Sequence, residues 1–468
     1  MKFTHKALQV IGALTVSALL SGCGALSLFE PEPTKTSTLD IPPSWQTRLK
    51  SGGSAHNWVR RFKSPELNDF VEEALKNNYN LKTAALRIDQ LRASELLTKR
   101  RQRPSISSST GTSSSGDSSE LNLTPSSYRV SFGSNWEFDL WGRLKAQQEL
   151  AELNTLEAQS DFYATRLSLA SSTANAYFNL ISAQNSKQLA DQTLAHFQNS
   201  LRIIERNYKA GIPGTDALDV QFGRNNITSA KRRLAASELS LVRSAQTLET
   251  LLGRYPSGTL RAKSQLPQPL STFPNVVPSE ALELRPDLLS ARRSLNATLI
   301  SAQIQKLELL PSFSLQGRIN GSSGVSLQDL LDPGELSWSL GTSISHALFD
   351  NKVQKTEIKQ TMLRYESSIN SYTQNTISAL REIEFALHSE NSLARQSQLL
   401  AEEVKVSTLA ETQSQRDYTQ GLNNGNILSV LEAQRRAVNA RSTLINIKNE
   451  RLRNQVALFT AIGGNPVK

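Results

Sequence analysis

The apolar positions of this chain follow two different periods, and each period predicts a different element. Over residues 65–103 they keep the three- and four-residue spacing of an amphipathic helix, which Pro104 ends. Residues 128–138 alternate strictly between apolar and polar side chains, which predicts a strand with one apolar face. A weaker partner strand is expected at residues 105–114, where nearly every residue is Ser, Thr or Gly.

The longest helical pattern follows this hairpin, over residues 141–209. Small and apolar residues recur there at a constant interval of seven, the spacing of a coiled coil: Phe162, Leu169, Ala176, Ala183, Ala190, Phe197 and Ile204. At about 1.5 Å per residue, such a helix would reach on the order of 100 Å. A turn at Gly211 and Gly214 ends it, and a shorter return helix is expected over residues 215–252.

The same order of elements occurs a second time. Three landmarks recur with offsets of 207 (280 minus 73), 211 and 210 residues: Glu73-Ala74-Leu75 as Glu280-Ala281-Leu282, Phe138-Asp139 as Phe349-Asp350, and Leu252-Gly253 as Ile462-Gly463. A near-constant offset indicates that one unit was duplicated. We therefore predict a first repeat at 65–253, an irregular linker at 254–278, a second repeat at 279–463 and a tail at 464–468.

The second repeat is expected to hold alternating strands near residues 313–319 and 336–344, a long helix at 353–420 and a return helix at 426–462. Its helical seam is more polar than that of the first repeat. The polar residues at seam positions are Glu390, Ser397, Glu411 and Ser414. This register suggests that the second helix pair faces water more than the first.

The amino terminus predicts export and a lipid anchor. Two lysines and an apolar stretch of about 14 residues precede Leu20-Ser21-Gly22-Cys23, and this stretch is too short to span a bilayer as a helix. The tetrad resembles the bacterial lipobox, in which the cysteine is acylated and becomes the first mature residue. We predict a signal peptide at 1–22 and an irregular, lipid-anchored, Pro-rich leader at 23–64. Gly24 after Cys23 implies delivery to the outer membrane and contact with its lipid.

Export changes the interpretation of the strands. Each is about ten residues long, the length of a transmembrane β-strand, with aromatic residues near its ends. Their apolar faces could pack on a soluble core, but an exported chain with a lipobox favours membrane insertion. Four strands cannot close a spanning sheet, because lipid tolerates no open edge and single-chain barrels begin at about eight strands. A barrel shared between chains would have eight strands in a dimer or twelve in a trimer.

Composition and charge exclude several other functions. The formal charge of +10 falls to +8 without Lys2 and Lys6, and the basic residues alternate with acidic ones, so no nucleic-acid partner is expected. The five histidines are scattered, and the chain has only two methionines and one cysteine, so we expect no metal site and no cofactor. Because no catalytic constellation is present either, the sequence predicts a conduit that is not an enzyme.

Several motifs together resemble the TolC/OprM outer-membrane efflux family, specifically its lipoprotein, NodT-type members. They are the lipobox, the Pro-rich leader, the duplication, the opening Leu284-Arg285-Pro286-Asp287-Leu288 of the second repeat, and the Tyr-x-x-Gly turns followed by Leu431-Glu432-Ala433-Gln434-Arg435. The resemblance implies an α+β membrane protein in which a homotrimer builds a twelve-stranded β-barrel continued by an α-helical periplasmic tunnel. It also implies docking on a periplasmic adaptor (membrane fusion) protein and an inner-membrane pump of the resistance-nodulation-division (RND) type.

The function implied is that of the outer-membrane channel of a tripartite efflux pump, which passes drugs or toxic small molecules from periplasm to exterior. A duct for type I protein secretion is the alternative, and the lipobox favours efflux. A structural coiled-coil lipoprotein without a barrel is a third possibility, against which the alternating aromatic strands argue.

Two sets of site residues follow from the resemblance. Matching the family's gate pattern on the second return helix gives Leu428, Glu432 and Arg435, which share one helix face. Three leucines would form an apolar constriction, and three glutamates would attract cations, with Arg435 partly offsetting their repulsion. Alternatively, Leu428 packs in the seam and the other two form a solvated pair. The first copy has Leu218, Phe222 and Asn225 at the equivalent places. The helix-tip turns expected to dock the adaptor contain Gly211, Gly214, Gly421 and Gly425.

Overall fold

The computed structural model describes residues 39–114, 127–212, 215–323, 332, 334, 336–420 and 427–467. Contacts divide this chain into two compact units. We call Arg87–Ala158 with Ser290–Thr373 the strand unit, and Asp40–Leu86, Gln159–Leu289 and Gln374–Lys468 the helical unit. Cys23 lies outside the described residues, as do Gly214, Gly421 and Gly425.

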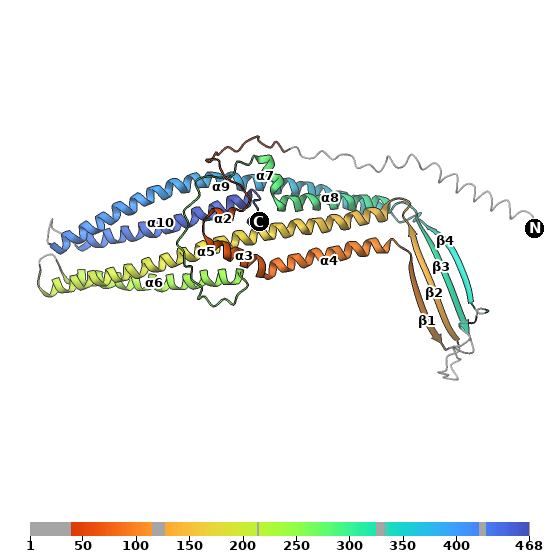
Figure 1. Ribbon diagram of the computed structural model, residues 1–468, viewed down its shortest axis with the longest axis horizontal. Coiled ribbons are helices and arrows are strands. Elements are labelled where there is room, and N and C mark those ends of the chain that lie inside the picture. The colour runs from red at the N-terminus through yellow and green to blue at the C-terminus, as the bar shows by residue number, and fades with distance from the viewer. Residues whose placement is uncertain are drawn as a thin grey trace, which may run out of the picture. The chain divides into compact units, whose positions relative to one another are not determined.

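The order of elements is the one that the duplication predicts (Figure 1). The first copy comprises α3 (Pro65–Asn77), α4 (Tyr79–Arg101), β1 (Ser105–Ser113), β2 (Ser127–Phe138), α5 (Arg143–Lys209) and α6 (Ala217–Leu251). The second comprises α7 (Pro278–Leu284), α8 (Pro286–Leu307), β3 (Ser312–Ser323), β4 (Leu336–Ser345), α9 (Val353–Gln420) and α10 (Ile427–Ala461). The long helices, the return helices and the weak strand at 105–114 are thus confirmed. None of the helices in the described ranges is both long and apolar enough to cross a membrane.

The single helix predicted for residues 65–103 is wrong, because the chain breaks at Asn78. That residue is extended (φ −63°, ψ 127°) and ends α3. Its side-chain oxygen accepts hydrogen bonds from the backbone amides of Asn80 and Leu81, which caps α4, and its amide donates to the Leu251 carbonyl at 3.0 Å. The second copy breaks at the equivalent place, where Arg285 is extended before Pro286, as the residue before a proline usually is.

The strand unit holds one antiparallel sheet in the order β1-β2-β3-β4. Residues directly opposite each other share a face, and the register pairs Phe138 with Phe313 and Ile319 with both Phe132 and Trp338. The apolar residues of β2, β3 and β4 therefore share one face, to which β1 adds Ile106, and much of this face is exposed: Phe132, Ile319 and Trp338 are 45%, 46% and 78% exposed. Serine hydroxyls pair across the opposite face at 2.7 Å, between Ser109 and Ser131 and between Ser314 and Ser343. Among the described strands, β1 and β4 each pair on one side only.

The core of the helical unit includes part of the leader, which was expected to be irregular. The short helix α2 (Trp58–Arg61) buries Trp58 completely. Its ring stacks on Phe459 of α10 at 5.9 Å, and its indole nitrogen donates to the Gly464 carbonyl at 3.2 Å. Phe62 meets Phe178 of α5 at 5.4 Å. The leader thereby joins the core that α5 and α10 share.

The linker 254–278 has little regular structure, and side chains of the helices hydrogen-bond its backbone. Glu249 of α6 accepts from the backbone amides of Gly258 (2.7 Å) and Leu260 (3.0 Å) and from the Ser257 hydroxyl (3.0 Å). Further along, Glu66 accepts hydrogen bonds from the backbone amides of Lys263 and Ser264. Gln184 and Gln455 each donate to and accept from one backbone residue, Ala262 and Leu270 respectively. The linker is thus fixed by paired side-chain groups.

Glu249→Gln should loosen the first part of this linker. Both carboxylate oxygens accept hydrogen bonds, and an amide would turn one of these acceptors into a donor that faces a backbone N–H. Hydrogen bonds to a charged group contribute about 1.5–3 kcal/mol, so unfolding free energy should fall by about that amount. Hydrogen exchange should report faster exchange at the amides of Gly258 and Leu260, and Glu72→Gln, on an exposed position of α3, serves as the control.

The same contact should depend on pH. Burial alone would raise the pKa of Glu249, but the hydrogen bonds from Gly258, Leu260 and Ser257 hold that pKa below its ordinary value. A lowered folded-state pKa stabilises the fold above the unfolded-state pKa, and this contribution is lost as pH falls through the folded value. Protection of the linker amides should therefore decline only in that acid range. Equal decline in Glu249→Gln would contradict this account.

Candidate functional site

The tips of the two helical hairpins pack together in the helical unit. Ile204, Val220, Tyr418, Ile427 and Val430 are buried against one another there, so α5 and α6 of the first copy meet α9 and α10 of the second. Gly223 lets the helices approach closely, since a Cβ there would lie 2.8 Å from the Leu201 side chain. The tip is therefore a small core formed by both copies.

The first hairpin turn is described in part. Gly211 has a φ of 67°, a left-handed conformation that glycine adopts without strain, and its amide donates to the Tyr208 carbonyl at 3.1 Å. Asp216 then starts α6 by accepting from the amides of Leu218 and Asp219, and the Asp219 side chain completes the capping box. The turn predicted at Gly211 is thus confirmed as a helix end, and its role in docking is untested.

The three predicted gate residues lie together. Leu428, Glu432 and Arg435 line one cavity of about 530 Å³, which we call the tip cavity, between α5, α6 and α10. The other residues that line it are Phe197, Phe222, Asn225, Asn226, Ser229, Ala230, Arg233, Leu431 and Val438. Leu428 is 49% exposed, so it does not belong to the tip core. Phe222 and Asn225, the expected first-copy equivalents, line the same cavity, whereas Leu218 does not.

Glu432 is held by two arginines, one of which sequence reasoning missed. Arg435 donates to it from Nε at 2.9 Å, as the sequence predicted, and Arg436 donates from Nε at 2.8 Å. Hydrogen bonds from Arg436 first and Arg435 second lower the pKa of Glu432. The signal for Arg436 was present, because it stands four residues after Glu432 on the same helix.

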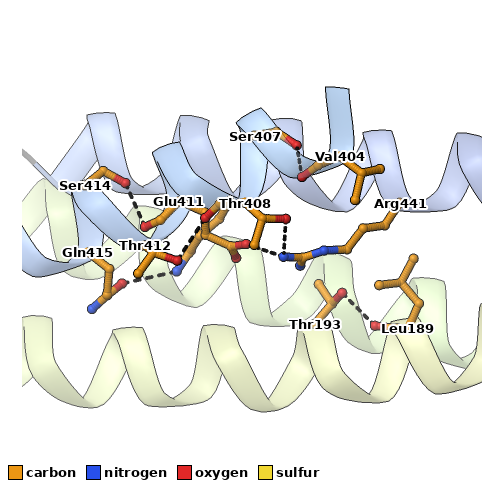
Figure 2. Close-up of polar contacts among 11 residues, drawn as sticks. Leu189, Thr193, Val404, Ser407, Thr408, Glu411, Thr412, Ser414, Gln415 and Arg441 are labelled. Carbon is orange, nitrogen blue, oxygen red and sulfur yellow. Dashed lines mark hydrogen bonds and ion pairs between the residues drawn. The ribbon is translucent and has the colours of Figure 1, made fainter. Parts of the chain in front are cut away.

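Polar side chains link the helices above the tip (Figure 2). Figure 2 shows the Arg441 guanidinium reaching Thr408 and Glu411, and the distances are 3.0 and 2.7 Å. Gln434 donates to Gln415 at 3.3 Å and to Ser200 at 3.1 Å, which joins α10 to both α9 and α5. These contacts align the face of α10 that carries the gate residues.

The long helix α9 has fewer buried residues than α5, as the sequence predicted, but its seam residue Glu390 is buried, which the sequence did not predict. Glu390 is only 2% exposed and accepts from Arg451 and Gln455, both at 2.9 Å. Burial raises the pKa of Glu390, because its charged form is poorly solvated there. Glu411 pairs with Arg441 in the same way. The seam glutamates therefore hold α9 against α10.

The described residues offer little for catalysis or metal binding. Within the described ranges, no three His, Cys, Asp or Glu side chains gather closely enough to hold a metal ion. The tip cavity combines apolar, amide and charged groups, an arrangement that can restrict and select passing solutes.

Comparisons with known proteins agree with this geometry. The sequence model of the family described as "Outer membrane efflux protein" matches twice, over residues 70–254 and 277–464. The pyoverdine export outer membrane protein OpmQ of Pseudomonas aeruginosa is 24% identical over 470 residues, covering 97% of this chain and 96% of that protein. The cation efflux system protein CusC of Escherichia coli O6:H1 is 27% identical, covering 87% and 88%.

Solved structures share the fold. A crystal structure of CusC superposes with a TM-score of 0.80 at 24% identity, covering 93% of this chain and 99% of that one. The outer-membrane channel OprN superposes with a TM-score of 0.78 at 25% identity, covering 93% and 98%. Since the family model spans both repeats, from the first helices to the ends of the return helices, this chain belongs to the outer membrane efflux protein family.

Proposed function

We propose that this chain is the outer-membrane channel of a tripartite efflux pump, which passes drugs or toxic small molecules from the periplasm to the exterior. Membership of the outer membrane efflux protein family makes it a transport component and not an enzyme. The observation that carries the proposal is the four-stranded sheet. It has an apolar face, much of which is exposed, and its outer strands β1 and β4 each pair on one side only among the described strands.

Assembly as a homotrimer would complete this sheet. In lipid every backbone group must be paired, so β1 of one copy must meet β4 of the next until the sheet closes. Three copies supply twelve strands, and the apolar faces then form the outer surface of one barrel. The resemblance to the TolC/OprM family favours three copies over the eight-stranded dimer.

We further propose that the helix tips dock a periplasmic adaptor and, through it, an inner-membrane pump of the RND type. The turn at Gly211 lies at the end of α5, and Gly421 and Gly425, the corresponding turn residues of the sequence prediction, lie outside the described residues. Gating by Leu428, Glu432 and Arg435 belongs to the same proposal. Support comes from the tip cavity, which brings these residues together with Phe222 and Asn225.

Cys23 is the proposed lipid anchor. A relative named probable outer membrane lipoprotein SilC, of Salmonella typhimurium, is 25% identical over 414 residues, and its name supports a lipoprotein here. Mass spectrometry of the mature amino terminus should find an acylated Cys23. An unmodified terminus upstream of residue 23 would contradict the anchor.

The relatives' names describe different cargoes, namely pyoverdine, cations and toluene, so they support efflux without choosing a substrate. Cross-linking and copurification from the native membrane test the proposal. An adaptor and an RND pump should copurify, and a strain lacking this chain should become more sensitive to toxic compounds. Copurification with an ABC-type exporter, together with loss of a secreted protein, would instead establish the type I secretion duct.

A further inference from the structure

The tip cavity carries an excess of positive charge. Its charged lining residues are Arg233 on α6 and Glu432 and Arg435 on α10. Arg436 adds a third guanidinium, because it shares the Glu432 carboxylate with Arg435. The lining residues alone carry a net charge of +1 in each chain, and Arg436, which does not line the cavity but lies beside it, brings the local sum to +2. Among the described residues, no carboxylate lies within ion-pair distance of Arg233.

The groups on the neighbouring elements do not offset this charge. The remaining lining positions on α5 and α6 are uncharged: Phe197, Phe222, Asn225, Asn226, Ser229 and Ala230. The acidic side chains near these positions along the chain interact elsewhere. Asp191 pairs with Lys187 at 2.5 Å, and Glu238, five residues after Arg233, interacts electrostatically with the same lysine. Asp216 and Asp219 form the capping box of α6, and Glu205 pairs with Arg224 at 3.2 Å.

This geometry reverses the expectation from the sequence alone. A ring of glutamates was expected to attract cations, with Arg435 as a partial offset. In the structure each Glu432 carboxylate accepts from two guanidinium groups, at 2.7–2.9 Å, so its charge is already neutralised locally. One positive charge of the Arg435 and Arg436 pair is therefore left over, and Arg233 adds another. Arg435 and Arg436 are 60% and 73% exposed, so their free N–H groups can reach such a solute.

We infer that the tip cavity selects anions, and that the solutes of this channel carry carboxylate, phosphate or sulfonate groups. The inference rests on the proposed function, because it requires the cavity to line a conduction path. Three copies would place about three net positive charges on the cavity linings around one axis, with Arg436 of each copy beside them, and there the potentials of the copies add. Guanidinium groups bind planar anionic groups through two parallel N–H donors, and they stay charged at every physiological pH.

Reversal potentials in planar lipid bilayers test this inference with potassium chloride as the probe. The purified full chain is reconstituted across a KCl gradient with about 0.1 M on the concentrated side, where screening extends over about 10 Å. Chloride should permeate more readily than potassium. Arg435→Gln combined with Arg436→Gln should lower the chloride-to-potassium permeability ratio at least about twofold, whereas Glu432→Gln should raise it.

Two controls separate cavity charge from other effects. Arg232→Gln removes the same charge one residue away from Arg233, at an exposed position that does not line the tip cavity, and should leave the ratio unchanged. Arg435→Lys combined with Arg436→Lys keeps the charge and should preserve chloride preference, which excludes misfolding as the cause. A parent channel that prefers potassium, or a ratio that the double glutamine variant leaves unchanged, would overturn the inference. Failure of the parent to form any pore would instead count against the proposed function.

Discussion

Replacing Gly463 by alanine is expected to destabilise the fold more than the same change at the other glycines with positive φ. Gly463 has a φ of +81°, and a Cβ there would lie 2.5 Å from the backbone carbonyl oxygen of Leu284. A left-handed conformation costs a non-glycine residue about 1–3 kcal/mol, and the clash adds to this because backbone cannot swing away. Thermal unfolding of the purified protein measures the loss.

The Leu284 carbonyl is fixed by its neighbour Arg285. That guanidinium, which is nearly buried, donates to the Ala461 carbonyl at 2.9 Å, to Asp287 at 2.8 Å and to Glu382 at 2.9 Å. The break between α7 and α8 is therefore tied to the end of α10 and to α9. This explains why Leu-Arg-Pro-Asp opens the second repeat and why a glycine closes it.

Alanine substitutions at two other glycines separate the cost of the left-handed conformation from the cost of the clash. Gly253 is the first-copy equivalent, with a φ of +72° and a Cβ position 3.1 Å from the Asn77 carbonyl, so its alanine variant should lose less stability. Gly142 has a φ of +78° with nothing within 4 Å of its Cβ position, so it reports the conformational cost alone. Equal losses at 142 and 463 would show that the contact with Leu284 does not matter.

Leu428→Ser is expected to raise the resting conductance of reconstituted channels at least about twofold, because it would remove an apolar side chain from the proposed gate. Leu428 is 49% exposed on the tip cavity and faces the region lined by Phe222. Its packing contribution to the tip core should be small, so folding and assembly should persist. Single-channel recording at fixed voltage is the measurement.

Leu218→Ser is the matched control for this variant. Leu218 is its first-copy counterpart and is 58% exposed, but it does not line the tip cavity. Its conductance should equal that of the parent. If Leu428→Ser also matches the parent, the residue lies on an outer wall, and the proposed gate is wrong.

The sequence predicted most of the helical pairs because their signals are long and repeated. The seven-residue interval of α5 and the recurrence of Leu252-Gly253 as Ile462-Gly463 can both be recognised even where a single position departs from the pattern. The break at Asn78 was missed because no proline or glycine marks it there. The weaker signals were Asn78 itself, a residue type that favours helix N-caps, and Pro286 at the equivalent break of the second copy, whereas the bond to the carbonyl of Leu251 is a tertiary contact.

The sequence predicted that the three proposed gate residues lie together, but not their electrostatics. Spacing placed Leu428, Glu432 and Arg435 on one face, and the tip cavity confirms that they lie together. The same spacing does not show that Arg436 shares the carboxylate or that Arg233 of the other repeat faces it. The burial of Glu390 in the seam of α9 was missed for a similar reason. A glutamate at a seam position suggests exposure to solvent, but Glu390 is buried and accepts hydrogen bonds from Arg451 and Gln455.

Mass measurement of the folded protein in detergent tests the central claim most directly. Because the four strands of one chain leave open edges at β1 and β4, the account predicts a stable particle of three copies. Each mature chain should contribute slightly less than 51.6 kDa, since the signal peptide is expected to be removed. A folded species that is predominantly monomeric, or dimeric with eight strands, would contradict the trimeric barrel and the channel built on it.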